Sequence, residues 1–246
     1  MKLITSKDNS FIKSVLKLKT KKGRQKTGEF ILDGYRIVMH AIENNIELTA
    51  IIMTEEFSKA HEVEFANKII TSESIMKTLV ETESPQGIIA IAKIKELPIK
   101  NGPVLFLDQI QDPGNLGTLI RTAEAAGFGG VMLRKGCTDP YSQKSIRSSM
   151  GSIVSIPIIT GLETDDLLKL DYKIYGAALE GGKPYKKVSY PSESVLIIGN
   201  EAGGIAKEVL DIVHERVYIP MKGDVESLNA SIAGGILMFE IAACLS

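Results

Sequence analysis

The sequence is poor in the residues that build disulfide frameworks, metal sites and membrane spans. Its 246 residues include no tryptophan, two cysteines and three histidines. No run approaches the roughly 18 apolar residues that a membrane helix needs. Two cysteines in a chain of this length exclude a disulfide framework. Residues 1–7 lack the apolar core of a signal peptide. These absences predict a cytoplasmic globular protein with no membrane segment.

Several common catalytic arrangements are also missing. The chain contains no G-x-x-x-x-G-K-[ST] phosphate loop, no G-x-G-x-x-G dinucleotide fingerprint and no G-x-S-x-G nucleophile motif. His40, His61 and His214 are scattered and have no cysteine partner at metal-ligand spacing, so we predict no metal site. Cys137 and Cys244 stand alone, without a neighbour that would activate a thiolate. The sequence therefore argues against kinases, metalloenzymes, hydrolases and nucleotide-binding oxidoreductases.

What the chain does have is a 44% apolar fraction, enough for one large domain or two small ones. Its net charge of −1 is unevenly distributed. Residues 1–36 contain ten basic and three acidic residues, a net charge of +7, and the remainder carries −8. Residues 20–28 (TKKGRQKTG) are polar and contain two glycines, which predicts a mobile loop. A basic stretch fits a solvated helix face as well as a phosphate-binding surface, so it decides nothing alone.

Short apolar segments alternate with helical patterns, which predicts an α/β protein with largely parallel sheets. We expect strands at residues 30–32, 48–53, 68–70, 88–94, 104–110, 130–133, 154–159, 173–179, 195–199 and 216–220. We expect helices at residues 35–44, 73–80, 115–126, 142–149, 163–170, 205–212 and 227–243. A polar stretch with two prolines and a glycine suggests a linker at 96–103, between domains at 1–95 and 104–246.

Three loops of the second domain follow predicted strands and run into predicted helices, at residues 112–129, 197–205 and 219–236. The carboxyl ends of parallel strands meet at one edge of a sheet, where ligands usually bind. Backbone N–H groups at helix starts suit carbonyl, carboxylate or phosphate partners. Arg121 lies on a largely apolar helix and Glu201 in a glycine turn. Both side chains call for a defined partner.

The uncharged residues of these loops have structural explanations as well. Asn115 and Ser227 fit ordinary helix N-caps, the commonest role of such residues before a helix. Gly199, Gly203 and Gly204 fit turn positions with positive φ. Composition alone leaves the functional and the structural interpretation open for each.

The three loops, in this order, resemble the three signature motifs of the SpoU/TrmH branch of the SPOUT RNA methyltransferases. The first motif, P-x-N-x-G-x-x-x-R-T-A, is matched by Pro113, Asn115, Gly117, Arg121, Thr122 and Ala123. The second, G-N-E-G-x-G, is matched by Gly199, Asn200, Glu201 and Gly204, with Ala202 replacing a glycine. The third, I-P-M-x-G-x-x-x-S-L-N-x-S-x-A, is matched throughout residues 219–233. The resemblance covers about residues 104–243.

Two further stretches support the resemblance. Residues 146–153 (IRSSMGSI) look like the Arg- and Ser-rich segment of the family, with Met150 where a smaller residue is common. Residues 21–42 resemble a substrate-binding domain, similar to RNA-binding ribosomal proteins, that is often fused in front of the catalytic domain; Asp33 stands where relatives often have Glu. This resemblance makes the basic segment an expected RNA contact, with the RNA-binding residues Lys21, Lys22, Arg24, Lys26 and Arg147.

The resemblance implies a fold and a reaction. The expected fold is a C-terminal α/β-knot methyltransferase domain with a deep trefoil knot, preceded by a small α/β RNA-binding domain. The expected assembly is a homodimer through the knot region and the last helix. The expected reaction transfers a methyl group from S-adenosylmethionine to a ribose 2′-hydroxyl of structured RNA, ribosomal rather than transfer RNA. A direct displacement of this kind needs alignment and no metal.

The resemblance also implies site residues. The cofactor would contact Gly199, Ile219, Leu228, Asn200 and Leu179. The catalytic set would be Arg121, Asn115, Glu201, Ser227 and Asn229. Since a guanidinium titrates above about 12, we expect Arg121 to donate hydrogen bonds to the developing alkoxide rather than act as a general base.

Three alternatives stay open on the sequence: a transfer-RNA 2′-O-methyltransferase, a catalytically inactive RNA-binding member of the fold, and a base-methylating SPOUT branch. The intact catalytic set disfavours the second, and the S-L-N-x-S form of the third motif disfavours the last.

Overall fold

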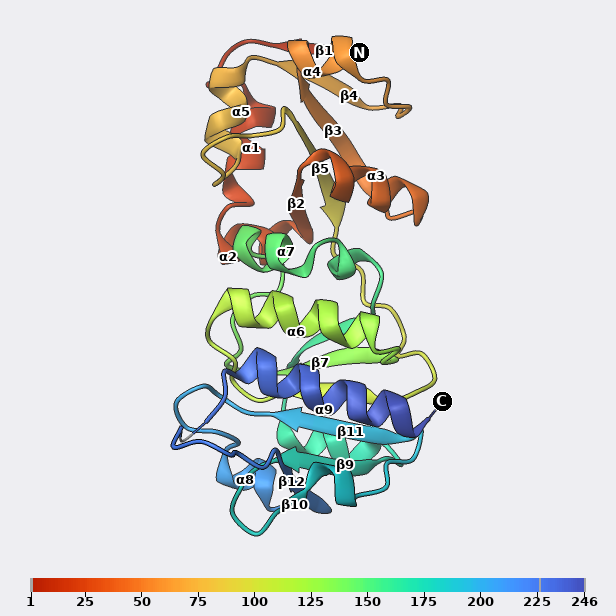
Figure 1. Cartoon of the computed structure of the whole chain (residues 1–246). Helices are drawn as coiled ribbons and strands as arrows, with labels where there is room; N and C mark the ends of the chain where they lie inside the picture. Colours follow the sequence, from red (N-terminus) through yellow and green to blue (C-terminus); the bar gives the residue numbers. More distant parts are fainter. Residues whose placement is uncertain (1, 226, 246) are drawn as a thin grey trace. The chain divides into compact units, whose positions relative to one another are not determined.

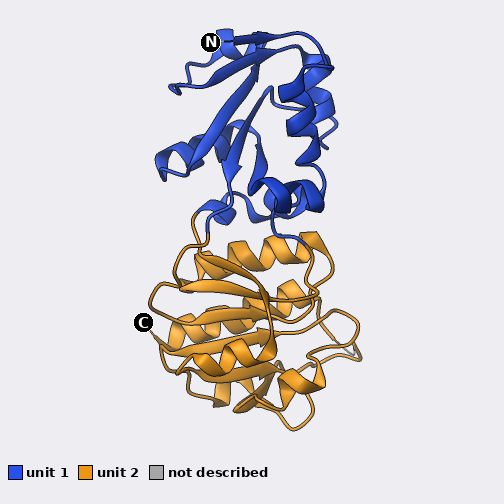
Figure 2. Cartoon of the chain, turned by 180° about the vertical axis from the view of Figure 1, so that it is seen from behind, with its two compact units in different colours: residues 1–95, 139–154 blue, residues 96–138, 155–246 orange. Residues whose placement is uncertain are grey.

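The computed structural model describes residues 2–225 and 227–245. The chain divides into two compact units (Figure 2). Unit 1 consists of Met1–Lys95 and Asp139–Val154, and unit 2 of Glu96–Thr138 and Ser155–Ser246. Each unit has its own buried apolar core. No helix in the described part of the chain is both long and apolar enough to cross a membrane.

Unit 1 is built on a mixed sheet of β1 (Lys2–Ile4), β2 (Glu29–Asp33), β3 (Leu48–Thr54), β4 (Lys68–Thr71) and β5 (Ile88–Lys93). The strand order is β1-β4-β3-β5-β2, and β5 runs antiparallel to both of its neighbours (Figure 1). Its helices are α1 (Ser10–Lys17), α2 (Lys21–Thr27), α3 (Tyr35–Glu43), α4 (Glu55–Ala60), α5 (Glu73–Leu79), α7 (Gln143–Ser149) and the 3₁₀ helix η1 (Ser152–Val154). The sequence pattern missed the short elements β1 and α4.

The stretch predicted to be a mobile loop, residues 20–28, forms the helix α2, so that prediction was wrong. The Thr20 side chain caps the helix by accepting a hydrogen bond from the Gly23 N–H at 3.1 Å. Gly28 ends it with a φ of +67°, a conformation that glycine adopts without strain. Gly23 disfavours a helix locally, but a Cβ there would overlap the Lys17 carbonyl, so close packing explains this glycine.

Residues 139–154 pack within unit 1, although the sequence pattern groups them with the C-terminal domain. Arg24 explains part of this: its guanidinium forms an ion pair with Asp139 at 2.6 Å, and both side chains are largely buried. Gln143 is buried as well, and its Nε2 donates to the Leu79 carbonyl at 3.1 Å. A boundary drawn from composition cannot detect pairings between such distant residues.

Unit 2 is a parallel sheet of β6 (Val104–Leu107), β7 (Gly130–Arg134), β8 (Ile158–Leu162), β9 (Lys173–Ala177), β10 (Lys183–Pro184), β11 (Ser194–Ile198) and β12 (Glu215–Tyr218). The strand order is β10-β12-β9-β11-β6-β7-β8, and neighbouring strands are parallel throughout. The remaining elements are α6 (Pro113–Ala125), α8 (Lys207–Leu210), α9 (Ala230–Cys244), η2 (Thr164–Lys169) and η3 (Tyr185–Lys187). The predicted α/β class is confirmed.

The helices α6 and α9 lie side by side over the sheet of unit 2 (Figure 1). Gly234 makes the close approach possible, because a Cβ at this position would overlap the Leu119 side chain of α6. Three strands that precede the sequence motifs, β6, β11 and β12, end at the same edge of this parallel sheet. The topology therefore brings the three loops together.

Candidate active site

The site lies where the loops after β9, β11 and β12 enclose a pocket of about 470 Å³. Its walls are mainly apolar side chains and loop backbone, among them Ala177, Ile198, Val217 and Leu237. Polar side chains of the second and third motifs, Asn200, Glu201, Ser227 and Asn229, line it as well. Pockets of this size and character are typical of small-molecule and cofactor sites.

Asn115 of the first motif is free to act on other loops because it does not cap its helix. The cap of α6 is Asp112, whose side chain accepts from the Asn115 N–H at 2.8 Å, and Pro113 occupies the first turn. The interpretation of Asn115 as an N-cap was therefore wrong. Its amide group points to the second and third motifs instead.

Asn200 folds the loop of the second motif. Its backbone pairs in both directions with Gly204 at 2.9 Å, while its Oδ1 accepts from the N–H groups of Ala202 and Gly203. Its Nδ2 donates to the Gln109 carbonyl at 2.8 Å, which ties the loop to the end of β6. The hydrogen bonds of this uncharged side chain therefore fix the turn and hold it against the end of β6.

The three glycines of this loop differ in their need to be glycine. Gly204 has a φ of +67°, as the turn interpretation expects. Gly199 has no positive φ, but a Cβ there would overlap the backbone of Gly204 and Ile205. Gly203 meets neither condition, since a Cβ would find open space. The turn interpretation therefore holds only for Gly204.

Asn229 caps α9 in the third motif. Its Oδ1 accepts from the Ser231 N–H at 2.9 Å, the Ser231 hydroxyl at 2.6 Å and the Ile232 N–H at 3.3 Å. Ser227, which also fitted an N-cap, lies two residues earlier and lines the pocket. The structural alternative for Ser227, an N-cap, does not hold, because Asn229 occupies that position.

A chain of hydrogen bonds joins the three motifs. Asn229 Nδ2 donates to Asn115 Oδ1 at 3.0 Å, and Asn115 Nδ2 donates to Glu201 Oε1 at 3.0 Å. The Gln111 N–H donates to the second carboxylate oxygen at 3.4 Å. Donation runs in one direction, from Asn229 to Asn115 and from Asn115 to Glu201, so each of the two amide groups has a defined orientation. We call Asn229, Asn115 and Glu201 the polar relay.

Glu201 is held in its charged form. Burial alone would raise its pKa, but hydrogen bonds from the Asn115 side chain and from neighbouring backbone N–H groups lower the pKa below its ordinary value. The carboxylate is therefore ionised at neutral pH and serves as a hydrogen-bond acceptor. A hydroxyl group presented to the relay would find a fixed negative charge there.

The pocket fits S-adenosylmethionine in size and chemistry. All five predicted cofactor residues line it: Gly199, Ile219, Leu228, Asn200 and Leu179. Its apolar walls suit an adenine ring and a methionine chain, and its loop backbone offers amide groups to polar atoms. A side chain at Gly199 would clash with the loop itself.

Arg121 stands apart from this pocket. It is exposed on α6, does not line the pocket and has no hydrogen-bond partner in the described residues. Of the predicted catalytic set, Glu201, Ser227 and Asn229 line the pocket, and Asn115 is bonded to two of these. The structure thus brings four of the five together and leaves the guanidinium of Arg121 available to another molecule.

Sequence reasoning missed a buried ionic group behind the second motif. Asp108, at the end of β6, binds Arg134 Nη1 at 2.8 Å and accepts from the Ala206 N–H at 2.7 Å. Arg134 also pairs with Glu208 at 2.6 Å. The group fastens the far end of the loop to β6. The sequence contained one signal for this ionic group, because Asp108 directly follows the apolar residues 104–107 of a buried strand.

The predicted RNA-binding residues divide into exposed and buried groups. Lys21, Lys22 and Lys26 are exposed on α2. Arg24 is only 4% exposed and its guanidinium is bound to Asp139 and to the Leu18 carbonyl, so we correct its assignment: it holds unit 1 together. Arg147 of α7 is half-buried and lines a different cavity, described below.

The thiol of Cys137 is not activated. Burial raises the pKa of Cys137 to about 11, and its thiol donates to the Leu107 carbonyl. No group of three His, Cys, Asp or Glu side chains in the described residues could hold a metal ion.

The parallel sheet, the pocket at its carboxyl edge and the polar relay all lie within the part of the chain that matches a family of RNA methyltransferases. The SpoU rRNA Methylase family matches residues 102–239, and the MRM3-like substrate binding domain matches residues 9–90. The chain belongs to the SpoU rRNA methylase family.

Similar proteins agree with this assignment. The 23S rRNA (guanosine(2553)-2'-O)-methyltransferase RlmP of Bacillus subtilis is 35% identical, over 98% of this chain and 99% of the relative. The AdoMet-bound rRNA methyltransferase from Sinorhizobium meliloti superposes with a TM-score of 0.89 and 29% identity, covering 100% of this chain and 98% of that one. A solved RNA 2'-O ribose methyltransferase gives a TM-score of 0.81 and 26% identity over 99% of each chain. The predicted family, enzyme class and cofactor are confirmed.

Proposed function

We propose that this protein methylates a ribose 2′-hydroxyl of ribosomal RNA, with the polar relay and Arg121 acting on the ribose. The observation that carries the proposal is the bonded relay at the side of the apolar pocket, which unites all three sequence motifs. When bound, S-adenosylmethionine supplies an electrophilic methyl group. Ribosomal RNA is supported by the family that matches and by the names of the relatives.

The chain's own residues orient the ribose. Glu201 is charged and accepts a hydrogen bond from a ribose hydroxyl, while Asn115 and Asn229 keep this carboxylate in place. Ser227 lies at the pocket and contributes a further hydroxyl. Arg121 donates hydrogen bonds to the alkoxide that develops as the hydroxyl passes its proton to the Glu201 carboxylate. Fixed partners of this kind lower the barrier by orientation and by electrostatic stabilisation.

The substitution Arg121→Ala tests the role of the guanidinium. We expect methyl transfer to fall about 1000-fold, because one preorganised donor contributes roughly this factor. The dissociation constant of S-adenosylmethionine, measured by calorimetry, should stay unchanged because Arg121 does not line the pocket. The matched control is Glu124→Ala on the exposed side of the same helix. Loss of cofactor binding along with activity would make Arg121 a scaffold residue.

The RNA class is tested by mapping ribose methylation in total RNA from cells with and without the gene. A 2′-O-methyl mark lost from ribosomal RNA supports the proposal. A mark lost from transfer RNA overturns the substrate class, and no lost mark together with no cofactor binding overturns the enzymatic function. The cytoplasm, where ribosomal RNA is found in bacteria, is the proposed location.

We also propose a deep trefoil knot and a homodimer. The knot is supported by the path of the chain: β12 is separated from β11 by β9, yet the following helix α9 returns to pack on α6 and β11. The homodimer is supported by α9, which is apolar on all sides and leaves Ile232 and Phe239 54% and 52% exposed. Such a helix is normally covered. Sedimentation of the wild type and of Phe239→Glu should give a dimer and a monomer respectively.

A further inference from the structure

Unit 1 contains a cavity of about 340 Å³ that the proposed reaction does not use. Three separate stretches of unit 1 line it: residues 33–37, which join β2 to α3, residues 82–86 before β5, and residues 146–151 at the end of α7. The volume is large enough for a nucleobase with part of its ribose.

Two charged groups in this cavity lack full partners. Asp33 is half-buried; its Oδ2 accepts from the Thr82 hydroxyl at 2.9 Å, and its Oδ1 has no hydrogen bond in the described residues. The Nη1 of Arg147 is buried and also has no partner there. The two side chains form no ion pair with each other, although each lies within the other's field. Buried polar groups are normally satisfied, so the buried Nη1 of Arg147 without a partner, in a cavity that the Asp33 carboxylate also lines, indicates a missing ligand.

The polar groups face a space with apolar walls. Ile37, Ile146 and Met150 line the cavity together with the charged pair. Met150 ends α7 with a φ of +51° and its side chain is 55% exposed, a costly conformation for a residue with a side chain. Apolar walls around a few convergent polar groups suit a flat, heteroatom-bearing ring.

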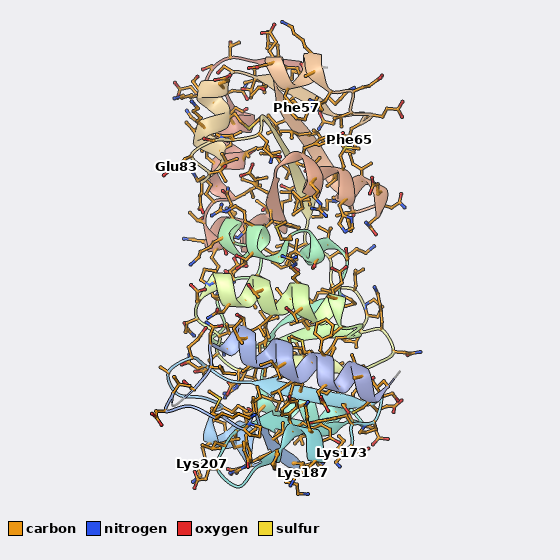
Figure 3. All side chains as sticks on the ribbon, in the orientation of Figure 1. Phe57, Phe65, Glu83, Lys173, Lys187 and Lys207 are labelled. Atoms are coloured by element: carbon orange, nitrogen blue, oxygen red, sulfur yellow. The ribbon has the colours of Figure 1, made fainter. Side chains whose placement is uncertain are left out.

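A second cavity of about 470 Å³ adjoins the first, since Ser84 and Gln86 line both. It contains Phe57, labelled in the upper part of Figure 3, which stacks on His61 at a ring distance of 4.3 Å. Tyr35 packs on both rings. Phe57 is buried, whereas Tyr35 and His61 are exposed, and single-stranded RNA is commonly bound by exposed aromatic faces next to base pockets.

We propose that the cavity of Asp33 and Arg147 binds a single unpaired guanine of the substrate RNA. Guanine offers two adjacent donors, N1–H and the N2 amino group, which match a carboxylate, and two acceptors, O6 and N7, which match a guanidinium. Adenine places an acceptor at N1, where a carboxylate repels it. Arg36, exposed at the rim, faces the neighbouring phosphate. The inference rests on the proposed RNA substrate and adds a base preference to it.

The test measures binding of short uridine oligonucleotides that carry one central guanosine, inosine or adenosine to the full-length protein. Inosine lacks the N2 amino group, so we expect about tenfold weaker binding than for guanosine, and weaker binding still for adenosine. Asp33→Asn replaces an acceptor by a donor and should bring the three affinities together. The matched control Asp8→Asn, an exposed carboxylate of the same unit, should keep the preference.

A second variant and a stability measurement keep the test decisive. Arg147→Met removes the partner of O6 and should weaken guanosine binding about tenfold. Thermal unfolding of each variant shows whether unit 1 stays folded. Equal affinity of the wild type for guanosine and adenosine overturns the inference, as does a preference that survives Asp33→Asn in a folded protein.

The outcome is separable from that of the proposed function. Cofactor binding, measured by calorimetry, depends on the pocket of unit 2 and should be the same in all these variants. A guanosine preference without any methyl transfer would sustain the base pocket and overturn the enzymatic function. Methyl transfer to ribosomal RNA without a guanosine preference would sustain the enzymatic function and overturn the base pocket.

Discussion

All strands of the sheet of unit 2 are parallel, whereas β5 of unit 1 runs against its neighbours. Parallel strands send their carboxyl ends to one edge, so the loops after β6, β11 and β12 meet and share one hydrogen-bonded relay. Four of the five strands of unit 1 also share one direction, since only β5 is reversed, and two stretches of its charged cavity lie at the end of β2 and before β5. The third stretch, residues 146–151, comes from α7, far along the chain. The comparison teaches that both sheets gather loops at one edge, but the site of unit 2 is formed by loops that follow its own strands, whereas the cavity of unit 1 needs α7 as well.

The largest effect is expected in unit 1, where Arg24→Met leaves Asp139 buried without its partner. Breaking a buried ion pair costs about 3–5 kcal/mol, so we expect this loss in the free energy of unfolding by denaturant. Lys59→Met, which breaks an exposed pair on α4, is the control and should change little. A small effect of Arg24→Met would mean that residues 139–154 are dispensable to unit 1, and the comparison of the two units would lose its main example.

The next largest effect is expected in unit 2 from Gly199→Ala. The new methyl group would overlap the backbone of Gly204 and Ile205, which distorts the cofactor pocket. We expect the affinity for S-adenosylmethionine to fall about 100-fold, the upper range for overpacking. Gly203→Ala, with open space for its methyl group, should bind as the wild type does. Equal affinities in calorimetry would show that the loop is less rigid than its hydrogen bonds indicate.

A smaller effect is expected from Lys22→Ala, on the same helix as Arg24 but exposed. The free energy of unfolding should stay unchanged, while binding of RNA at low salt should weaken. The slope of the logarithm of the RNA binding constant against the logarithm of the salt concentration should fall in magnitude by about one. The measurement is binding to ribosomal RNA over a salt series. An unchanged slope would remove this lysine from the RNA contact.

The smallest effect concerns the charge of Glu201. Its folded pKa is lowered from the ordinary 4.5, so the carboxylate contributes stability above pH 4.5, and this contribution is lost as the pH falls through the lowered pKa. The melting temperature of the wild type should therefore exceed that of Glu201→Gln at neutral pH and approach it in acid. A constant difference at all pH values would show that shape, rather than charge, orders the relay.

The elements of the catalytic domain could largely be predicted from the sequence, because each buried parallel strand is a short apolar run followed by turn residues. The strand expected at 154–159 begins only at Ile158, since η1 occupies residues 152–154. The N-caps of α6 and α9 could not be predicted, because each preceding loop contains two candidate residues close together. The fold places Asp112 rather than Asn115 at the cap of α6, and Asn229 rather than Ser227 at the cap of α9. The ion pair of Arg134 with Asp108 joins different strands, and no local pattern contains it.

The basic segment was harder to interpret, because exposed and buried positive charges look alike in a sequence. Lys22 and Arg24 are neighbours on α2, yet one is solvated and the other lies at 4% exposure against Asp139. A guanidinium with several donors can satisfy a buried carboxylate and a carbonyl together, which a sequence pattern does not reveal. The partner had to come from residues 139–154, which belong to unit 1 only through the fold.

The chain passes between the two units three times, after Lys95, after Thr138 and after Val154. A fragment cut at Lys95 would therefore lack Asp139, Gln143 and one wall of the guanine cavity. Transferring residues 1–95 alone to another catalytic domain would therefore leave residues 139–154 of the recipient to complete the core of unit 1 and the wall of this cavity. A chimaera that keeps unit 1 intact has to carry both stretches of sequence.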